Sequence, residues 1–179
     1  DLGDGKEALA WYKRCNEQLH DTEFGRQSRD AIVGILRDDK QYELLAEACW
    51  DFARHGEDVE ETLRWGIQSA TIFYEKLARH EKASEVIWHL LEMGDAGEHE
   101  GELLALLRKL SENRGLVTLL RTSLDKSWDV EDGRFKELVD LLARDMAEPQ
   151  EAIVLAERAV ETFTYLDIPH RTLTTLFSE

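Results

Sequence analysis

Cysteine and proline are scarce in this chain of 179 residues, which contains two of each. Cys15 and Cys49 lack CxxC spacing, which argues against a disulfide framework and against a four-ligand zinc site, so we expect both to be small core residues. The eleven glycines do not cluster with Pro or Ser, so the sequence shows neither a flexible linker nor a low-complexity tail. We therefore expect one continuous domain over residues 1–179.

Long hydrophobic runs are also missing. No stretch reaches the roughly 18 apolar residues that a transmembrane helix requires, and no signal peptide is visible. The first residue is Asp1 rather than Met, and we expect the chain to be an excised part of a longer protein. A cytoplasmic location is the expectation, although a targeting signal could precede Asp1.

Basic residues are outnumbered: 38 Asp and Glu face 22 Lys and Arg, for a formal net charge of −16. This balance repels phosphate backbones and anionic lipid surfaces. We expect neither nucleic acid nor membrane as a partner. The acids are spread along most of the chain, as is typical of a solvated surface.

Period-two alternation, the pattern of a half-buried strand, is not sustained anywhere, whereas apolar residues recur at helical spacing. The sequence therefore predicts an all-α fold. The expected helices cover residues 5–20, 26–38, 40–55, 59–79, 81–93, 101–114, 116–127, 132–146, 149–166 and 169–177.

Glycine, proline and aspartate account for the breaks between these helices. Four glycines suit left-handed helix ends, two prolines suit first helical turns, and three aspartates suit capping positions. These residues are Gly25, Gly56, Gly94, Gly115, Pro149, Pro169, Asp21, Asp58 and Asp95.

An internal repeat is the most informative feature. When residues 43–56 are shifted by 38 positions onto residues 81–94, Glu, Glu, Trp and Gly coincide. The apolar i, i+4, i+7 stripe of one helix face also recurs. Its members are Ala8, Tyr12, Cys15; Leu45, Cys49, Phe52; Ala83, Ile87, Leu90; and Ala152, Ala156, Ala159, with a fifth set at Leu116, Leu119 and Leu120. With leading positions at 8, 45, 83, 119 and 152, the intervals of 33 to 38 residues indicate helical-hairpin repeats.

The stretch from Arg64 to Gly97 resembles one tetratricopeptide repeat, with Thr71 and Tyr74 in its first helix and the Ala83 stripe in its second. The run that starts at Pro149 is similar to a second helix of the same family. Four of the five units depart from the 34-residue length and mostly lack the first-helix signature, so longer HEAT-like hairpins are the neighbouring possibility.

Such hairpins cannot bury their apolar stripes alone, so stacking about five of them is expected to give a right-handed superhelical α-solenoid. The resemblance to tetratricopeptide proteins implies that first helices line a concave, partner-binding groove. Aligned in this way, the candidate contacts are Gln27, Asp30, Arg37, Trp65, Gln68, Ile72, Lys76 and Arg108. Lys and Arg would pair with carboxylates, and Gln68 would hydrogen-bond an extended backbone.

Tryptophan is the residue type that bears most directly on this groove. Trp50 and Trp88 recur at the repeat period, and we expect them to pack between neighbouring helices. Trp65, near the start of a first helix, is a candidate exposed anchor for a partner. The alternative is that Trp65 covers the adjoining hairpin.

Catalytic and metal-binding motifs are missing as well. His80, Glu81, Glu85 and His89 lie on or near one helix but lack HExxH spacing, and no GxSxG, P-loop or Rossmann fingerprint occurs. We expect no metal, no cofactor and no enzyme activity. The favoured function is a protein-interaction scaffold for a protein or peptide with a basic segment. The alternatives are an all-α enzyme domain and an RNA-binding or sensor helical repeat.

Overall fold

The computed structural model describes residues 2–19, 22–56, 58–94, 96–127, 133–163 and 167–178. Within these ranges the chain is helical and contains no strand, as the apolar periodicity predicted. The α-helices are α1 (Leu2–Leu19), α2 (Glu23–Asp38), α3 (Tyr42–Arg54), α4 (Val59–Glu75), α5 (His80–Glu92), α6 (Glu100–Leu110), α7 (Asn113–Lys126), α8 (Arg134–Asp140), α9 (Pro149–Thr162) and α10 (Asp167–Ser178). A 3-10 turn, η1 (Gly97–His99), precedes α6, and a π-helical turn, η2 (Leu141–Asp145), extends α8.

Each expected helix has its counterpart in this order, with ends shifted by up to four residues. The largest difference in character is at residues 132–146, where the α-helix gives way to the π-helical turn. None of the helices in the described ranges combines the length and apolar character needed to cross a membrane.

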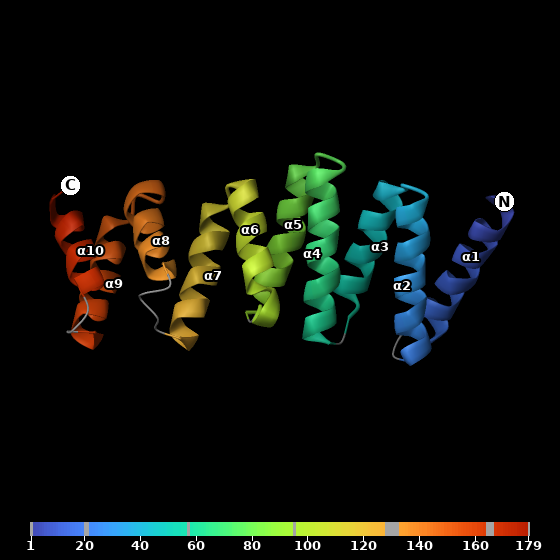
Figure 1. Cartoon of the computed structure of the whole chain (residues 1–179), viewed down its shortest axis with the longest axis horizontal. Helices are drawn as coiled ribbons and strands as arrows, with labels where there is room; N and C mark the ends of the chain where they lie inside the picture. Colours follow the sequence, from blue (N-terminus) through green and yellow to red (C-terminus); the bar gives the residue numbers. More distant parts are fainter. Residues whose placement is uncertain are drawn as a thin grey trace. The chain divides into compact units, whose positions relative to one another are not determined.

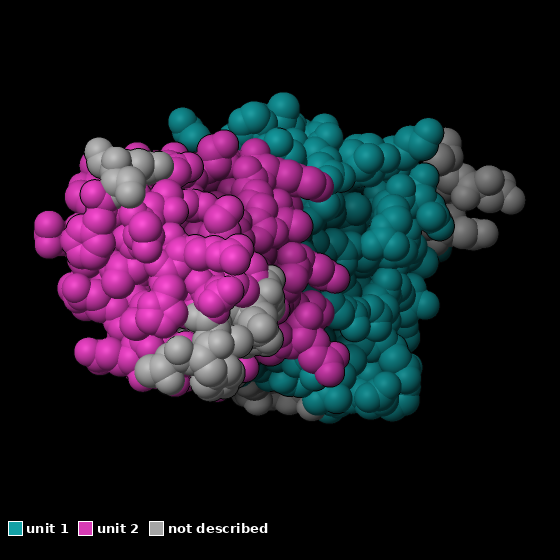
Figure 2. Space-filling model, turned by 60° about the vertical axis from the view of Figure 1, so that its left-hand side comes forward, with its two compact units in different colours: residues 1–90 teal, residues 91–179 magenta. Residues whose placement is uncertain are grey.

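The chain divides into two compact units, residues 1–90 and residues 91–179, coloured separately in Figure 2. In the first unit, α1 packs on α2, α2 on α3 and α3 on α4 (Figure 1). In the second unit, α6 packs on α7, α7 on α8, α9 on α8 and η2, and α10 on α9. The expectation of one continuous domain stays a prediction.

One turn geometry recurs between the first and second helices of four hairpins. Each turn contains one non-glycine residue with a left-handed backbone: Lys40, Ala78, Ser111 and Ala147. In each case the next residue donates its backbone N–H to the carbonyl of a fully buried apolar residue at the end of the preceding helix. The acceptors are Leu36, Phe73, Leu107 and Leu142. This is the helix-capping geometry in which a left-handed residue satisfies otherwise orphaned carbonyls.

The turns alternate between two forms. The donor after Lys40 or Ser111 reaches back five residues, whereas the donor after Ala78 or Ala147 reaches back six. Positions in the second helices can therefore be aligned by counting from the left-handed residue of each turn, whatever the side chains are.

The stripe of each second helix begins five residues after the left-handed residue. This position is Leu45 in α3, Ala83 in α5 and Ala152 in α9, and all three are buried as predicted. In α7 the same spacing selects Leu116, so the leading position predicted at Leu119 is wrong. The α7 stripe is Leu116, Leu120 and Ser123, all buried. The polar Ser123 concealed this register in the sequence.

Two of the four predicted glycine breaks lie inside helices instead. Gly25 lies in α2 because Thr22 already caps that helix, its hydroxyl oxygen accepting the N–H of Gly25 at 3.2 Å. Gly115 lies in α7, where an added Cβ would stand 2.5 Å from Leu107 Cδ2, so this glycine permits close packing.

Of the other predicted breaks, Gly94 has the expected left-handed backbone, with φ of 85°, and Gly56 does not. Pro149 opens α9 and Pro169 lies in the first turn of α10, as predicted. Asp58 caps α4, and its side chain accepts the N–H of Glu60 at 3.0 Å. Asp21 and Asp95 lie outside the described residues.

Replacing Ala78 by glycine should stabilise the protein. An L-residue in the left-handed region costs about 1–2 kcal/mol, and glycine removes that cost while adding less than about 1 kcal/mol of unfolded-state entropy. We expect Ala78→Gly to raise the free energy of unfolding by about 0.5–1 kcal/mol in urea denaturation. The matched control, Ala10→Gly in the interior of α1, should lower it by about 1 kcal/mol. Equal losses for both variants would contradict the turn geometry.

Candidate partner-binding grooves

The first unit has a groove between the second helices α1 and α3, to which α2 contributes Arg29 and Ile32. Its volume is about 750 Å³. We call it the α1/α3 groove. It is lined by Lys13, Asn16, Glu17, Arg29, Ile32, Leu44, Glu47, Ala48, Asp51, Phe52 and His55.

An apolar stripe runs along one wall of this groove. Leu44, Ala48 and Phe52 stand four residues apart on α3, so they share one helix face. Leu44 is 48% exposed, a high exposed fraction for a leucine, although the opposite face of α3 is buried in the core. Ala48 and Phe52 are half-buried, so the stripe offers apolar surface to a ligand mainly through Leu44.

Carboxylates flank the stripe. Glu47 and Asp51 lie beside it on α3, and Glu17 faces it from α1. The cations of the lining are Lys13 and Arg29, and Arg29 is paired with Glu61. The groove thus combines an apolar wall with a rim on which negative charge predominates.

A polar cluster holds the α2 side of the groove. Arg29 donates two hydrogen bonds to the carboxylate of Glu61, Nε to Oε1 and Nη2 to Oε2, both at 3.1 Å. Their side chains are only 11% and 17% exposed, so this pair is better shielded than a surface ion pair. Arg29 Nη1 also donates to Asn16 Oδ1 at 3.3 Å, and Trp65 Nε1 donates to Glu61 Oε1 at 3.2 Å. These contacts hold α1, α2 and α4 in place around the groove.

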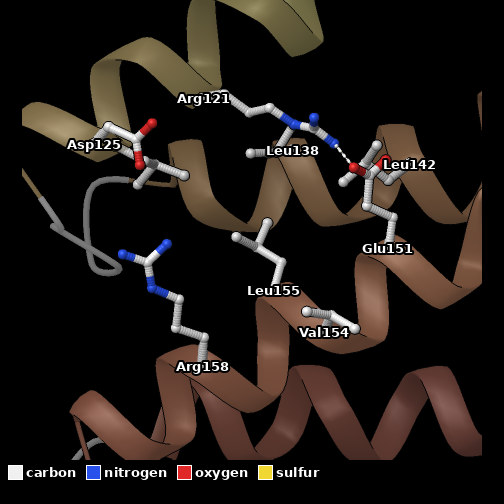
Figure 3. Close-up of a pocket in the computed structure, with 9 residues that line it drawn as sticks. Arg121, Asp125, Leu138, Leu142, Glu151, Val154, Leu155 and Arg158 are labelled. Atoms are coloured by element: carbon white, nitrogen blue, oxygen red, sulfur yellow. Dashed lines mark ion pairs between the residues drawn. The ribbon is translucent and has the colours of Figure 1, made fainter.

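The second unit contains the same groove between its own second helices, α7 and α9 (Figure 3). We call it the α7/α9 groove. Counted from Leu116 in α7 and from Ala8, the predicted stripe position in α1, residues Arg121, Leu124 and Asp125 correspond to Lys13, Asn16 and Glu17. The hairpin register pairs the α9 residues Glu151, Val154, Leu155 and Arg158 with Leu44, Glu47, Ala48 and Asp51 of α3. The two grooves are therefore one structural feature that recurs with the repeat.

Different side chains make the α7/α9 groove smaller, about 250 Å³. Leu155 occupies the position of Ala48, and its side chain projects into the groove, as Figure 3 shows. Glu151 occupies the position of Leu44 and forms an ion pair with Arg121 at 2.6 Å across the groove. The hydrogen bond from Arg121 lowers the pKa of Glu151. The α1/α3 groove is thus open at the positions where Leu155 fills the α7/α9 groove and the Glu151–Arg121 ion pair spans it.

The residues predicted from the first helices are only partly accessible. Gln27, Asp30, Arg37 and Lys76 are exposed, Gln68 is half-buried, and Trp65 and Ile72 are buried. Trp65 is 1% exposed, so the hypothesis that it is an exposed anchor is wrong, and its alternative role of covering the hairpin is confirmed. Its ring packs edge-on against Phe52, with ring centroids 5.5 Å apart.

Two of the predicted partner contacts, Asp30 and Arg108, form ion pairs with neighbouring first helices. Asp30 pairs with Arg64 of α4. Arg108 donates two hydrogen bonds to Glu137 of α8, at 2.8 and 2.6 Å, which raise the pKa of Arg108. Among the predicted contacts, none lines the α1/α3 groove.

The burial predicted for the other tryptophans and for the two cysteines is confirmed for one residue of each type. Trp50 is buried as expected, whereas Trp88 is 36% exposed, so its predicted packing between helices is only partial. Cys49 is fully buried, and burial raises the pKa of its thiol to about 12. Cys15 is half-buried rather than a core residue.

The candidate metal ligands do not converge. His89 packs its ring edge-on against Trp50, with centroids 5.1 Å apart, and Glu85 pairs with Lys82. In the part of the chain that the structure describes, no group of three or more His, Cys, Asp or Glu side chains is placed to hold a metal ion.

Leu44 and Ala48 were not among the predicted contacts because the resemblance placed the groove on first helices. A signal was present: Leu44 is a large apolar residue next to, and outside, the Leu45 stripe. Comparisons with protein-family models, with curated proteins and with solved structures found no match.

Proposed function

We propose that this chain is a protein-interaction scaffold built from tetratricopeptide-like helical hairpins in a right-handed superhelical arrangement. Its partner is a helical protein segment that carries Lys or Arg beside apolar residues. The α1/α3 groove is the binding site. This proposal moves the site from the first helices, where the resemblance placed it, to the face formed by second helices.

The open α1/α3 groove is the observation that carries the proposal. Grooves between two helices accept the apolar face of a third helix, which is read through residues at i, i+3, i+4 and i+7. The stripe of the exposed Leu44 and the half-buried Ala48 and Phe52 has the matching spacing. Burying one leucine-sized partner side chain there is worth roughly 1.5–3 kcal/mol.

Charge specifies the partner further. Glu17 and Glu47 are placed to pair with Lys or Arg on the polar flank of a bound helix. Asp51 forms an exposed ion pair with Arg54, which a partner cation can replace at small cost. The net charge of −16 steers such a segment toward the protein before contact. Charge should therefore govern association, and the apolar stripe should govern residence time.

A designed peptide tests this proposal. The probe is a fluorescein-labelled amphipathic helix, about five turns long, with Leu at i, i+3, i+4, i+7 spacing and Lys at the flanking positions. We call it the Lys/Leu peptide. Leu44→Glu should weaken its binding at least about tenfold in fluorescence anisotropy, which corresponds to about 1.4 kcal/mol, because the apolar stripe gains a desolvated charge.

Val59→Glu is the matched control, because Val59 is 47% exposed, lies in the same unit and does not line the groove. It adds the same negative charge and should change binding less than about threefold. Raising salt from about 0.05 to about 0.5 M should slow association of the wild-type complex. Equal effects of Leu44→Glu and Val59→Glu would remove the groove from consideration.

A further inference from the structure

One position of the second helices reaches across to the next second helix. It is the fifth residue after the leading residue of the stripe. In the first unit this residue is Trp50 of α3, whose ring packs edge-on against His89 of α5 with centroids 5.1 Å apart. In the second unit it is Arg121 of α7, which pairs with Glu151 of α9 at 2.6 Å, as the dashed line in Figure 3 shows. Each contact links two second helices directly.

Lys13 holds this position in α1, counted from Ala8. It is exposed and lines the α1/α3 groove. Within the described ranges, however, Lys13 takes part in no ion pair. The cause lies on α3, where the counterpart of Glu151 is the uncharged Leu44. The α1/α3 groove thus holds a cation without the carboxylate that the α7/α9 groove supplies at the same place.

The carboxylates of the α1/α3 groove stand further along both helices. The helices α1 and α3 run in the same direction, because each is antiparallel to α2 (Figure 1). Glu17 lies about one turn after Lys13 on α1, and Glu47 lies about one turn after Leu44 on α3. The groove therefore presents a positive charge at one level and negative charges at the next.

A helix bound over this groove removes water from Lys13. A lysine presents a compact, strongly hydrated charge on a flexible stem, with three N–H donors, so it can follow a carboxylate without a fixed geometry. An Asp or Glu of the bound helix would replace the lost hydration. A Lys or Arg at the same level would face a like charge, and a partner with that pattern is disfavoured.

We propose that Lys13 selects an Asp or Glu on the bound helix, at the place where Glu151 meets Arg121 in the second unit. The proposal rests on the proposed function and specifies its partner further. The partner segment carries one acidic residue beside its apolar face and has its Lys or Arg about one turn away, opposite Glu17 and Glu47. It is a segment of mixed charge in a defined order, not a uniformly basic one.

A positional set of peptides tests this order of charges. Each member is the Lys/Leu peptide with one flanking Lys replaced by Glu, at a different position in each member. All members have the same net charge, so long-range attraction to the protein is equal and local contacts alone separate their affinities. One member should bind the wild-type chain at least about fivefold tighter than the others in fluorescence anisotropy. Lys13→Arg should keep this preference, and Lys13→Glu should bind the parent peptide more tightly than that member.

Arg14→Glu is the matched control, because Arg14 is exposed, follows Lys13 on α1, does not line the groove and changes the net charge equally. It should keep the preferred Glu position, and circular dichroism checks that each variant folds. The proposal is overturned if all members bind the wild-type chain equally, if the preference survives Lys13→Glu, or if Arg14→Glu abolishes it as well.

Two kinds of failure are distinguishable. Binding that depends on Leu44 but shows no preferred Glu position would contradict the role of Lys13 alone. If neither the parent peptide nor any member binds in a Leu44-dependent manner, the proposed function fails and the role of Lys13 falls with it.

Discussion

Trp65→Ala should lower the free energy of unfolding by about 3–5 kcal/mol, the range for removing a fully buried aromatic side chain. The indole of Trp65 is 1% exposed and packs against Phe52. It also donates to Glu61, the carboxylate that holds Arg29. The substitution therefore leaves a cavity and loosens the polar cluster beneath the α1/α3 groove. Urea denaturation followed by circular dichroism measures the loss.

Trp11→Ala provides the matched control, because Trp11 belongs to the same unit and is 58% exposed. Its loss should cost no more than about 1 kcal/mol, since most of the ring already contacts solvent. If the two tryptophan variants were equally stable, the burial of Trp65 in this fold would be wrong.

Ala83→Asp should be equally damaging, with a loss of several kcal/mol. Ala83 is fully buried and opens the stripe of α5, where Ile87 and Leu90 follow it in the core. Two turns later on the same stripe, Leu90 packs closely on α4, because its side chain would stand 2.6 Å from a Cβ placed at Gly66. An aspartate at position 83 has neither space nor a partner for its charge. The expected result is a large fall in the denaturation midpoint.

The neighbouring substitution Lys82→Asp separates this effect from helix propensity. Lys82 is exposed, and its substitution places the same new residue, aspartate, one position earlier on the same helix. Its loss removes a surface pair with Glu85, which is worth less than about 1 kcal/mol. An unchanged melting temperature for Ala83→Asp would show that the repeat register is wrong.

The helices and much of the core could be predicted because they depend on local apolar periodicity. The stripes led by Ala83 and Ala152, and Leu45 and Cys49 of the third stripe, are buried where the i, i+4, i+7 pattern placed them, whereas Phe52 is half-buried. Pro149 and Asp58 likewise act through short-range geometry, a fixed φ and a side-chain cap. Such features require no knowledge of which helices meet.

The candidate site could not be predicted in the same way because it depends on contacts between helices. Trp65 has a polar nitrogen and a position typical of a groove, yet Glu61 satisfies that nitrogen inside the protein. Conversely, the exposed Leu44 lines a groove with residues of α1, a neighbour that periodicity along α3 does not specify.

The turn residues were unpredictable for another reason. Lys40, Ala78, Ser111 and Ala147 adopt a backbone that usually marks glycine, so none of them signals a turn by residue type. Ser123 concealed the α7 stripe because a small buried hydroxyl replaces the expected apolar residue. Only the recurring backbone hydrogen bonds show that the four hairpins share one register.

Site-specific photo-cross-linking in the native host tests the binding of a basic helical segment in the α1/α3 groove most directly. A diazirine-bearing amino acid replaces Leu44 in one variant and the equally exposed Val59 in the other. We expect that position 44, and not position 59, cross-links to a partner segment in which Lys or Arg flanks apolar residues at helical spacing. Equal cross-linking from the two positions, or a position-44 cross-link to a segment without basic residues, would contradict it.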